Sequence, residues 1–312
     1  MLFLGVDGGQ SATLALVADE AGRVLGAGEA GPCNHVQGPG GREKFLAAIR
    51  GSVEAACAQA GVAPAFAAAC LGFSGGPADK EALVREILPV ETLLVTDDAA
   101  IALTGAVGRQ PGIATIAGTG SIAYGRNAAG KRARAGGWGY LFGDEGSAFD
   151  LVRQALRAAL RFEEGWGPRT ALHPMLLEQT GARSANDLMH RFYTTDFPRS
   201  RIAALAPCIN EAAAKGDLSA IELLHAAAGQ LAMITAAVRA QLFAAGEPVR
   251  VAWMGGVFRG VRVRERFRTL VELEEGCTAG PAAHSPAAGA LMEAFQLAGL
   301  AVEPSDIPSP MP

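Results

Sequence analysis

The sequence predicts an α/β protein whose core is duplicated. Short apolar runs typical of strands alternate with longer runs that have a helical period, as in α/β folds. Residues 2–30 predict strand, glycine turn, strand, turn and strand, and residues 112–137 repeat this order. A chain of 312 residues is long enough for two lobes. We expect the boundary between the lobes to lie near Gly108 to Gly112.

The first half of the chain combines a strand meander with alternating helices and strands. Its apolar runs follow the strand period or the helical period, and Gly61 is the expected cap at the end of a helix. The expected strands cover 2–7, 12–19, 23–31, 66–76 and 92–96, and the expected helices cover 41–61, 79–88 and a segment that begins at Asp97 or Asp98.

The second half of the chain is expected to begin with strands, to continue as helices and to contain one more buried strand before its final helix. After the strands of 112–137, an Ala-rich helical region extends to about residue 245. A buried strand is expected within 248–258 and a final helix at 285–299. The Pro-rich tail at 303–312 is expected to be loose.

Composition excludes several classes of protein. Lys and Arg number 27 against 31 Asp and Glu, a formal charge of −4 that disfavours nucleic-acid and polybasic membrane binding. The start of the chain has no signal peptide pattern, and no run of about 18 uninterrupted apolar residues predicts a membrane span. Five scattered cysteines without a CxxC pair predict free thiols, and we expect a cytoplasmic protein.

Two motif matches in the second half do not fit their usual context. "GRNAAGK" at 125–131 has the spacing of a phosphate loop, but Arg132 follows where Ser or Thr is required. It lies between two predicted strands and is expected to be a hairpin turn. "GTGSIA" at 118–123 matches the dinucleotide fingerprint, yet it enters a strand and not the helix that the fingerprint requires.

Three glycine turns follow apolar strands: "DGGQSAT" at 7–13, "GTGS" at 118–121 and "GGVF" at 255–258. Such turns let backbone N–H groups converge on an anion, although each alone is more often an ordinary hairpin. The first two occur in the two copies of the meander, so together they could hold a polyphosphate while the third meets the nucleoside. The hydroxyls of Thr13, Thr119 and Ser121 would add hydrogen-bond donors. The predicted contacts of these turns with the polyphosphate and the nucleoside are Gly8, Gly9, Gln10, Ser11, Thr13, Gly118, Thr119, Gly120, Gly255 and Gly256.

A set of motifs in a fixed order identifies a family. The motifs are "GVDGGQSAT", "VTDDAAIALTGA", "IAGTGSIAYG", "GGWGYLFGDEGSA", "WMGGVF" and "SPAAGAL". The sequence resembles the BadF/BadG/BcrA/BcrD-type ATPase family from residue 2 to about 298, and most of all its N-acetylglucosamine and glucosamine kinase branch. The single glycine turns are weakly specific, whereas "GGWGxxxGDEGSA" and the order of the set are strongly specific.

The resemblance implies a two-lobed actin-like (ribonuclease H-like) ATPase fold. Each lobe would hold a five-stranded mixed sheet with helices, and the active site would lie in the interlobe cleft. The N-terminal lobe would cover 1–110 and the C-terminal lobe 111–285, with a helix at 286–300 packing back on the first lobe.

Phosphoryl transfer needs alignment, charge neutralisation and a group that accepts the proton of the attacking hydroxyl. The family pattern "DAxxALxGA" selects Asp98 as this base and leaves Asp97 to cap the helix; capping is also the alternative explanation of Asp98. Asp7 is expected to hold Mg²⁺, through water, because Mg²⁺ keeps much of its hydration shell. The alternative for Asp7 is a turn-capping role.

The stretch "GGWGYLFGDEGSAFDL" at 136–151 surrounds Trp138 with glycines and puts a carboxylate pair before a helix. Trp138 could cover the apolar face of a sugar or, alternatively, belong to the core, and Asp144 could accept hydrogen bonds from two hydroxyls or instead pin the loop. Glu145 would support the loop or the helix start. His35, next to the predicted site, is more typical of a structural histidine. The predicted substrate contacts are Asn34, Asp98, Ser121, Gly137, Trp138 and Asp144.

The sequence therefore predicts an ATP- and Mg²⁺-dependent kinase that phosphorylates N-acetylglucosamine or glucosamine at the 6-hydroxyl. The alternatives are an ATPase activator, or a non-catalytic sugar-responsive ATP-binding protein of the same superfamily. The expected ligands are an amino sugar and ATP, with no nucleic acid and no membrane. The sequence leaves open which amino sugar is used and whether the protein is a homodimer.

Overall fold

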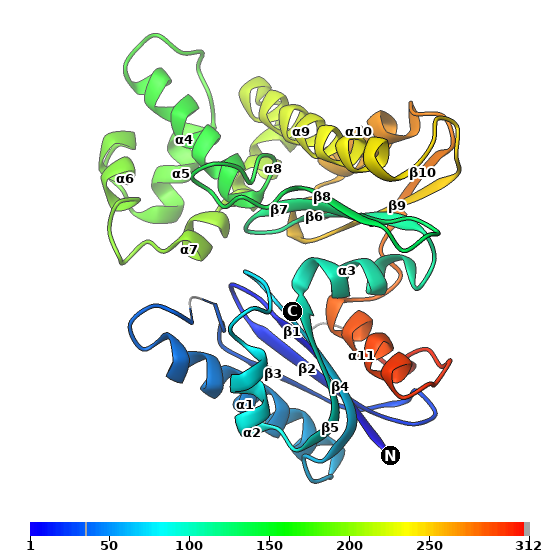
Figure 1. Cartoon of the computed structure of the whole chain (residues 1–312). Helices are drawn as coiled ribbons and strands as arrows, with labels where there is room; N and C mark the ends of the chain where they lie inside the picture. Colours follow the sequence, from blue (N-terminus) through cyan, green and yellow to red (C-terminus); the bar gives the residue numbers. More distant parts are fainter. Residues whose placement is uncertain (35, 309–312) are drawn as a thin grey trace. The chain divides into compact units, whose positions relative to one another are not determined.

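The computed structural model describes residues 1–34 and 36–308. The chain divides into two compact units: unit 1 is Met1–Gln110 with the segment from Ala282 onward, and unit 2 is Pro111–Pro281. Each unit contains one five-stranded sheet, and helices pack on it (Figure 1). The position of His35 lies outside the described residues.

Unit 1 is built on a mixed sheet with the strand order β3-β2-β1-β4-β5. The meander β1–β2–β3 is antiparallel, whereas β1, β4 and β5 run parallel to one another. The strands are β1 (Leu2–Gly8), β2 (Thr13–Asp19), β3 (Val24–Ala30), β4 (Phe66–Phe73) and β5 (Val90–Asp97). The helices are α1 (Gly41–Ala60), α2 (Glu81–Ile87), α3 (Asp98–Val107) and α11 (Pro286–Leu297).

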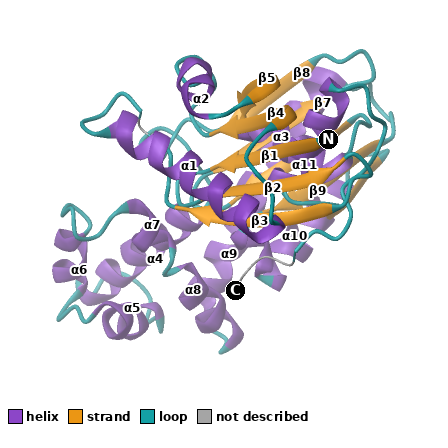
Figure 2. Cartoon of the chain, turned by 90° about the horizontal axis from the view of Figure 1, so that it is seen from below, coloured by secondary structure: helices purple, strands orange, loops and turns teal. Residues whose placement is uncertain are grey.

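The alternation of side chains along β1 supplies two separate apolar layers in unit 1. Leu4 and Val6 belong to a cluster that includes the buried face of α1. Phe3 points to the other side, where its ring lies 5.1 Å from that of Phe295 on α11. The sheet is thus covered on both faces, by α1 on one and by α11 on the other (Figure 2).

Unit 2 repeats this topology with the order β10-β9-β6-β7-β8. Again a three-stranded antiparallel meander, β6–β7–β8, continues through its first strand into parallel neighbours, β9 and β10. The duplication and the mixed sheets expected from the sequence are confirmed. The strands are β6 (Gly112–Ala117), β7 (Ser121–Arg126), β8 (Arg132–Gly136), β9 (Val249–Met254) and β10 (Cys277–Pro281).

Helices make up most of the remainder of unit 2. The helical region expected to extend to about residue 245 is confirmed, as six helices separated by short turns. Neither β10 nor the helix before it was predicted. The helices are α4 (Ala148–Glu163), α5 (Leu172–Thr180), α6 (Ala185–Arg191), α7 (Arg199–Ala203), α8 (Ala206–Ala214), α9 (Leu218–Leu242) and α10 (Val261–Glu272), with a short 3₁₀ helix, η1 (Gly256–Arg259), after β9.

One helix of unit 2, α9, is long and apolar enough to cross a membrane by length and composition alone. One side of α9 packs against β7 and β8 and against α8 and α10. Its buried Thr235 hydroxyl lies 2.7 Å from the hydroxyl of Thr115 on β6. Helix α9 is therefore part of the core of unit 2.

Two expectations about turns are confirmed. The expectation of a loose tail at 303–312 does not hold at Ser305, and 309–312 lie outside the described residues. "GRNAAGK" forms the hairpin between β7 and β8, where Asn127 N–H donates to the Lys131 carbonyl at 3.0 Å. "GTGSIA" enters strand β7 and not a helix. The tail is ordered at Ser305, which pairs with the β2–β3 turn: the N–H of Val24 donates to its carbonyl at 3.0 Å.

The contact between α3 and α11 gives a test of packing in unit 1. A Cβ added to Gly289 would lie 2.0 Å from the carbonyl oxygen of Ile101, which is backbone and cannot rotate away. We expect Gly289→Ala to lower the free energy of unfolding by about 3 kcal/mol, the upper part of the overpacking range. The matched control is Gly229→Ala on α9, where the added Cβ meets nothing within 4 Å and helix propensity predicts a gain of about 0.5–1 kcal/mol. Urea unfolding of both variants checks this, and an equal effect of the two substitutions would contradict it.

Candidate functional site

The ends of three parallel strands bring Asp7, the predicted metal ligand, and Asp98, the predicted base, to one edge of the sheet of unit 1. Gly8 on β1 pairs with Phe73 on β4, and Phe73 pairs with Asp97 on β5. Because parallel strands end at the same edge of a sheet, Asp7, Ser74 and Asp98 lie along one edge, the carboxyl edge of unit 1. Ligands in open α/β sheets bind at such edges.

Asp7 and Asp98 both have raised pKa values. Burial, followed by the negative charge of Asp98, raises the pKa of Asp7 to about 7. Burial and the negative charge of Asp97 raise the pKa of Asp98, opposed by a hydrogen bond of 2.8 Å from the N–H of Ala99 and by one from Ser74. Asp97 occupies the cap position of α3, but its side chain makes no capping hydrogen bond. The edge therefore favours a proton or a cation at these half-buried carboxylates.

The donor set at this edge fits a Mg²⁺ ion that arrives with a nucleotide. Carboxylate oxygens are hard ligands, and Mg²⁺ in phosphate-transferring enzymes is held by one or two of them together with the substrate phosphates. Among residues 1–34 and 36–308, no group of three or more His, Cys, Asp and Glu side chains could hold a metal ion. The remaining ligands of a cation at Asp7 would thus be phosphate oxygens and water.

The first glycine turn begins at this edge. The N–H of Gly9 donates to the carbonyl of Ala12 at 2.9 Å, and Gln10 reaches across to the Ser74 hydroxyl at 3.1 Å. Gly8 has no room for a side chain, since a Cβ would lie 2.3 Å from the ring of Phe73. Ser11 lies exposed in the same turn.

The Thr13 hydroxyl has a partner within the protein. Thr13 is buried at the start of β2, and its hydroxyl donates to the Gly31 carbonyl at 2.8 Å. A hydroxyl has one proton, so in this structure Thr13 fixes the start of the next loop, and its contact with ATP stays a prediction. That loop carries Asn34, whose side-chain oxygen accepts a 2.8 Å hydrogen bond from Lys44 on α1.

The two glycine turns of unit 2 also share an edge. Gly118–Gly120 connects β6 to β7, with Ala117 paired to Ser121. Gly255 follows β9, the parallel neighbour of β6, and has a φ of 98°. A Cβ on Gly255 would lie 2.4 Å from the carbonyl oxygen of Ala117, so only glycine allows this approach. The structure brings together the two turns of unit 2 that were predicted to bind nucleotide, with Gly256 opening η1.

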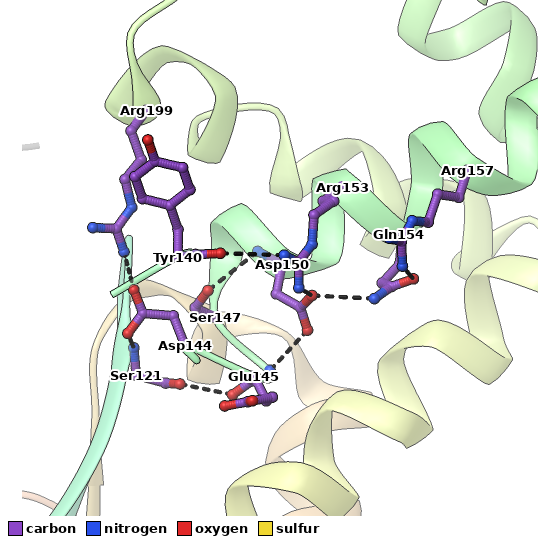
Figure 3. A network of polar contacts seen from close by, with 11 residues as sticks. Ser121, Tyr140, Asp144, Glu145, Ser147, Asp150, Arg153, Gln154, Arg157 and Arg199 are labelled. Carbon is purple, nitrogen blue, oxygen red and sulfur yellow. Dashed lines mark hydrogen bonds and ion pairs between the residues drawn. The ribbon is translucent and has the colours of Figure 1, made fainter. Parts of the chain in front are cut away.

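Asp144 lies against the first of these turns (Figure 3). Asp144 is 3% exposed and adopts a φ of 62°. Its carboxylate accepts a 3.2 Å hydrogen bond from the N–H of Ser121 and forms an ion pair with Arg199. A Cβ on Gly120 would lie 2.9 Å from both carboxylate oxygens. The carboxylate thus needs glycine opposite it, and its left-handed backbone is typical of residues held at functional sites.

Sequence reasoning missed Arg199, which comes from helix α7. Its guanidinium donates to the Thr119 carbonyl at 3.2 Å and lies 5.3 Å from the ring centroid of Tyr140. Arg199 is 55 positions from Asp144 in the sequence and belongs to no recognisable motif. Only the packing of α7 beside the loop reveals it.

The other residues of the motif have distinct positions. Trp138 is 67% exposed, with the guanidinium of Arg134 5.0 Å from its ring, so the alternative of a core tryptophan is wrong. Gly137 adopts a φ of 73° and packs against Ile122 on β7. The Ser121 hydroxyl, predicted as a ligand donor, donates to the Glu145 carbonyl at 2.7 Å instead.

The start of α4 is stabilised by a reciprocal cap that involves Ser147 and Asp150. The Ser147 hydroxyl accepts from the N–H of Asp150 at 3.1 Å, and the Asp150 carboxylate accepts from the N–H of Gly146 at 3.0 Å. Asp150, and not Glu145, is therefore the carboxylate that caps this helix.

Duplicated mixed sheets with glycine turns at their carboxyl edges define a two-lobed nucleotide-binding α/β protein. The sequence matches the model of the BadF/BadG/BcrA/BcrD ATPase family over residues 4–294, and the chain belongs to this family. Membership implies that the protein uses ATP.

Similar proteins with assigned activities include sugar kinases. The chain is 35% identical over 212 residues to an N-acetylmuramic acid/N-acetylglucosamine kinase from Clostridium acetobutylicum, covering 66% of this chain and 69% of the relative. It is 30% identical over 254 residues to an N-acetyl-D-glucosamine kinase from Dictyostelium discoideum, covering 76% and 79%.

Solved structures share the fold. A candidate N-acetylglucosamine kinase from Chromobacterium violaceum has a TM-score of 0.77 at 28% identity, over 93% of this chain and 98% of that one. A ROK family glucokinase from Streptomyces griseus has a TM-score of 0.58 at 20% identity, over 95% and 99%. These structures confirm the two-lobed α/β fold expected from the sequence.

The raised pKa of Asp7 predicts a pH-dependent stability. Its folded-state pKa is about 7 against an ordinary value of 3.8, so the folded protein retains a proton between these values that the unfolded chain loses. The resulting stabilisation is complete below about pH 4 and is lost as the pH rises through about 7. We expect Asp7→Asn, which cannot ionise, to become progressively more stable than the wild type between about pH 5 and pH 8. Urea unfolding of both proteins in metal-free buffer checks this, and a difference that is constant with pH would contradict it.

Proposed function

We propose that this protein transfers the γ-phosphoryl group of ATP to the 6-hydroxyl of an amino sugar, either N-acetylglucosamine or glucosamine. The observation that carries the proposal is Asp98, a half-buried carboxylate with a raised pKa at the carboxyl edge of a protein of this ATPase family. The names of the relatives from Clostridium acetobutylicum and Dictyostelium discoideum support an amino sugar as the acceptor.

Asp98 is suited to accept the proton of the attacking hydroxyl. A general base works best when its pKa approaches the working pH, and burial moves the pKa of Asp98 in that direction. As the proton leaves for Asp98, the hydroxyl oxygen forms a bond to the γ-phosphorus and the bond to the bridging oxygen of ADP breaks. Alignment and neutralisation of phosphate charge provide most of the catalysis in such reactions.

The glycine turns at the two carboxyl edges would hold the nucleotide. Gly8 to Ser11 in unit 1, and Gly118 to Gly120 with Gly255 in unit 2, would present backbone N–H groups to the phosphates. Gly8, Gly120 and Gly255 have no room for a Cβ. Asp7 would hold Mg²⁺ through water. A bound Mg²⁺ would neutralise the negative charge of the phosphates.

The acceptor sugar would be held by the predicted substrate contacts. The exposed ring of Trp138 offers an apolar surface, and the carboxylate of Asp144 and the amide of Asn34 offer hydrogen bonds to hydroxyls. Asp144 can accept from a sugar while keeping its bonds to Ser121 and Arg199, because a carboxylate has about four acceptor positions.

The arrangement of the cysteines does not support the alternative of an ATPase activator. An activator like the reductase-activating members of the family would use cysteines to hold an iron–sulfur cluster. All five cysteines here are free and buried, and the described residues contain no cysteine group that could hold a metal ion.

A screen of acceptors tests the proposal. ADP release should depend on a sugar when glucosamine, N-acetylglucosamine, N-acetylmannosamine, N-acetylmuramic acid and glucose are compared. We expect N-acetylglucosamine or glucosamine to give the highest kcat/KM, and 6-deoxy-N-acetylglucosamine to give no turnover because it lacks the accepting hydroxyl. Turnover that is the same with and without every sugar would contradict the proposal.

Asp98 and its neighbour Asp97 form a matched pair for mutation. We expect Asp98→Asn to bind sugar while losing turnover by about 10²-fold or more, the usual effect of removing a general base. Asp97→Asn should keep turnover within a few-fold of the wild type, because the Asp97 side chain makes no capping hydrogen bond and is not assigned to the reaction. Steady-state kinetics with saturating ATP measures both, and the reverse result would assign the base to Asp97.

A further inference from the structure

Arg199 connects two parts of unit 2 that the proposed function assigns to different ligands. One of its terminal nitrogens, Nη2, is paired with the Asp144 carboxylate and also donates to the Thr119 carbonyl at 3.2 Å. Asp144 belongs to the proposed sugar site, and Thr119 is the central residue of the turn proposed to hold phosphate. A single guanidinium nitrogen thus contacts both sites, and Figure 3 shows its pairing with Asp144.

The surroundings of Arg199 hold its guanidinium in one place. The Arg199 side chain is 19% exposed, and its Cζ lies 5.3 Å from the ring centroid of Tyr140 and 5.8 Å from that of Phe149. These rings contact each other edge to face, with centroids 5.1 Å apart. Planar guanidinium stacked on aromatic rings is a restricted arrangement that a flexible lysine does not reproduce.

The backbone around the ion pair leaves little room for an independent shift of either site. Gly120 faces both the Asp144 carboxylate and Nη2 of Arg199, at 2.9 Å and 2.8 Å from the position of an added Cβ. The N–H of Ser121, directly after Gly120, donates to the same carboxylate. The turn from Thr119 to Ser121 is therefore bonded to Asp144 both directly and through Arg199.

We propose that Arg199 is a positioning residue that couples sugar binding at Asp144 to nucleotide binding at the Gly118–Gly120 turn. This inference rests on the proposed function. Sugar hydroxyls that donate to Asp144 would bind the same carboxylate that forms the ion pair with Arg199. A shift of the Arg199 guanidinium would also change its hydrogen bond to the Thr119 carbonyl. Because binding linkage is reciprocal, nucleotide at the turn must change the affinity for sugar by the same factor.

The test replaces Arg199 by lysine, which keeps the charge but loses the fork and the planar stacking. Its control is Arg201→Lys on the same helix, an exposed arginine that donates to the Asp196 carbonyl and stacks on Phe197 away from the site. Calorimetry measures the dissociation constant of a non-hydrolysable ATP analogue with and without N-acetylglucosamine. Steady-state kinetics gives KM for sugar and kcat for the same proteins.

In the wild type and in Arg201→Lys, we expect sugar to tighten binding of the ATP analogue by about 5-fold or more, the lower part of the usual range of coupling. In Arg199→Lys this factor should fall to about 1 while KM for sugar rises about 10-fold. A purely structural ion pair would lower only the melting temperature and leave the coupling factor unchanged.

The outcomes separate this inference from the proposed function. A wild type that turns over N-acetylglucosamine, with a folded Arg199→Lys variant that keeps both the coupling factor and KM, would overturn the role of Arg199 and leave the kinase proposal standing. A wild type without any sugar-dependent turnover would overturn the kinase proposal itself. If Arg199→Lys is unstable, Tyr140→Leu weakens the stacking without removing the charge, and an unchanged coupling factor there would equally overturn the inference.

Discussion

The organisation of both units depends on parallel strands that end side by side. In unit 1 the strands β1, β4 and β5 end at Gly8, Phe73 and Asp97, and in unit 2 the strands β6 and β9 end beside the turns at Gly118 and Gly255. A carboxyl edge gathers loops from distant parts of the sequence, so each strand can contribute one functional segment. Duplication gives the protein two such edges. The edge of unit 1 carries the carboxylates Asp7 and Asp98, and the edge of unit 2 carries the ion pair of Asp144 with Arg199.

The two edges differ in how their charges are balanced. Asp7 and Asp98 in unit 1 are half-buried carboxylates with raised pKa values, and a neighbouring carboxylate contributes to each shift, which favours a proton or a cation. Asp144 in unit 2 already has its cation, because Arg199 is bound to it. Unit 1 is therefore suited to accept a proton and to hold a phosphate-bound metal ion, whereas unit 2 offers a carboxylate in a fixed position for hydrogen bonding.

Much of the fold could be predicted from the sequence, because the local signals agree with the tertiary structure. Strand β1 has the expected apolar pattern, α1 ends at Gly61 as its capping glycine predicts, and the hairpin at Asn127 follows from its turn residues. Strand β10 was missed: it is short and ends in Gly280 and Pro281, so only its pairing with β9 makes it a strand.

The candidate site was predictable in its motifs but not in its hydrogen bonds. Asp144 and the glycine turns belong to segments whose spacing is specific, and the structure shows why Gly120 and Gly255 must be glycine. The partners of Thr13 and Ser121 could not be predicted, because Gly31 and Glu145 accept their protons through backbone carbonyls, which any residue type supplies. Arg199 was missed for a related reason: its role comes from the packing of α7 and not from any local pattern.

The central claim is that this protein transfers phosphate to a sugar and not to water. The most direct measurement uses ATP that is radioactively labelled at its γ-phosphate, in the presence of N-acetylglucosamine or glucosamine. Separation of sugar phosphate from inorganic phosphate then shows which product carries the label. The account predicts that the label appears in the sugar, at the rate at which ADP forms, and that this transfer is lost in Asp98→Asn. Label that appears only as inorganic phosphate, at the same rate with and without sugar, would contradict it.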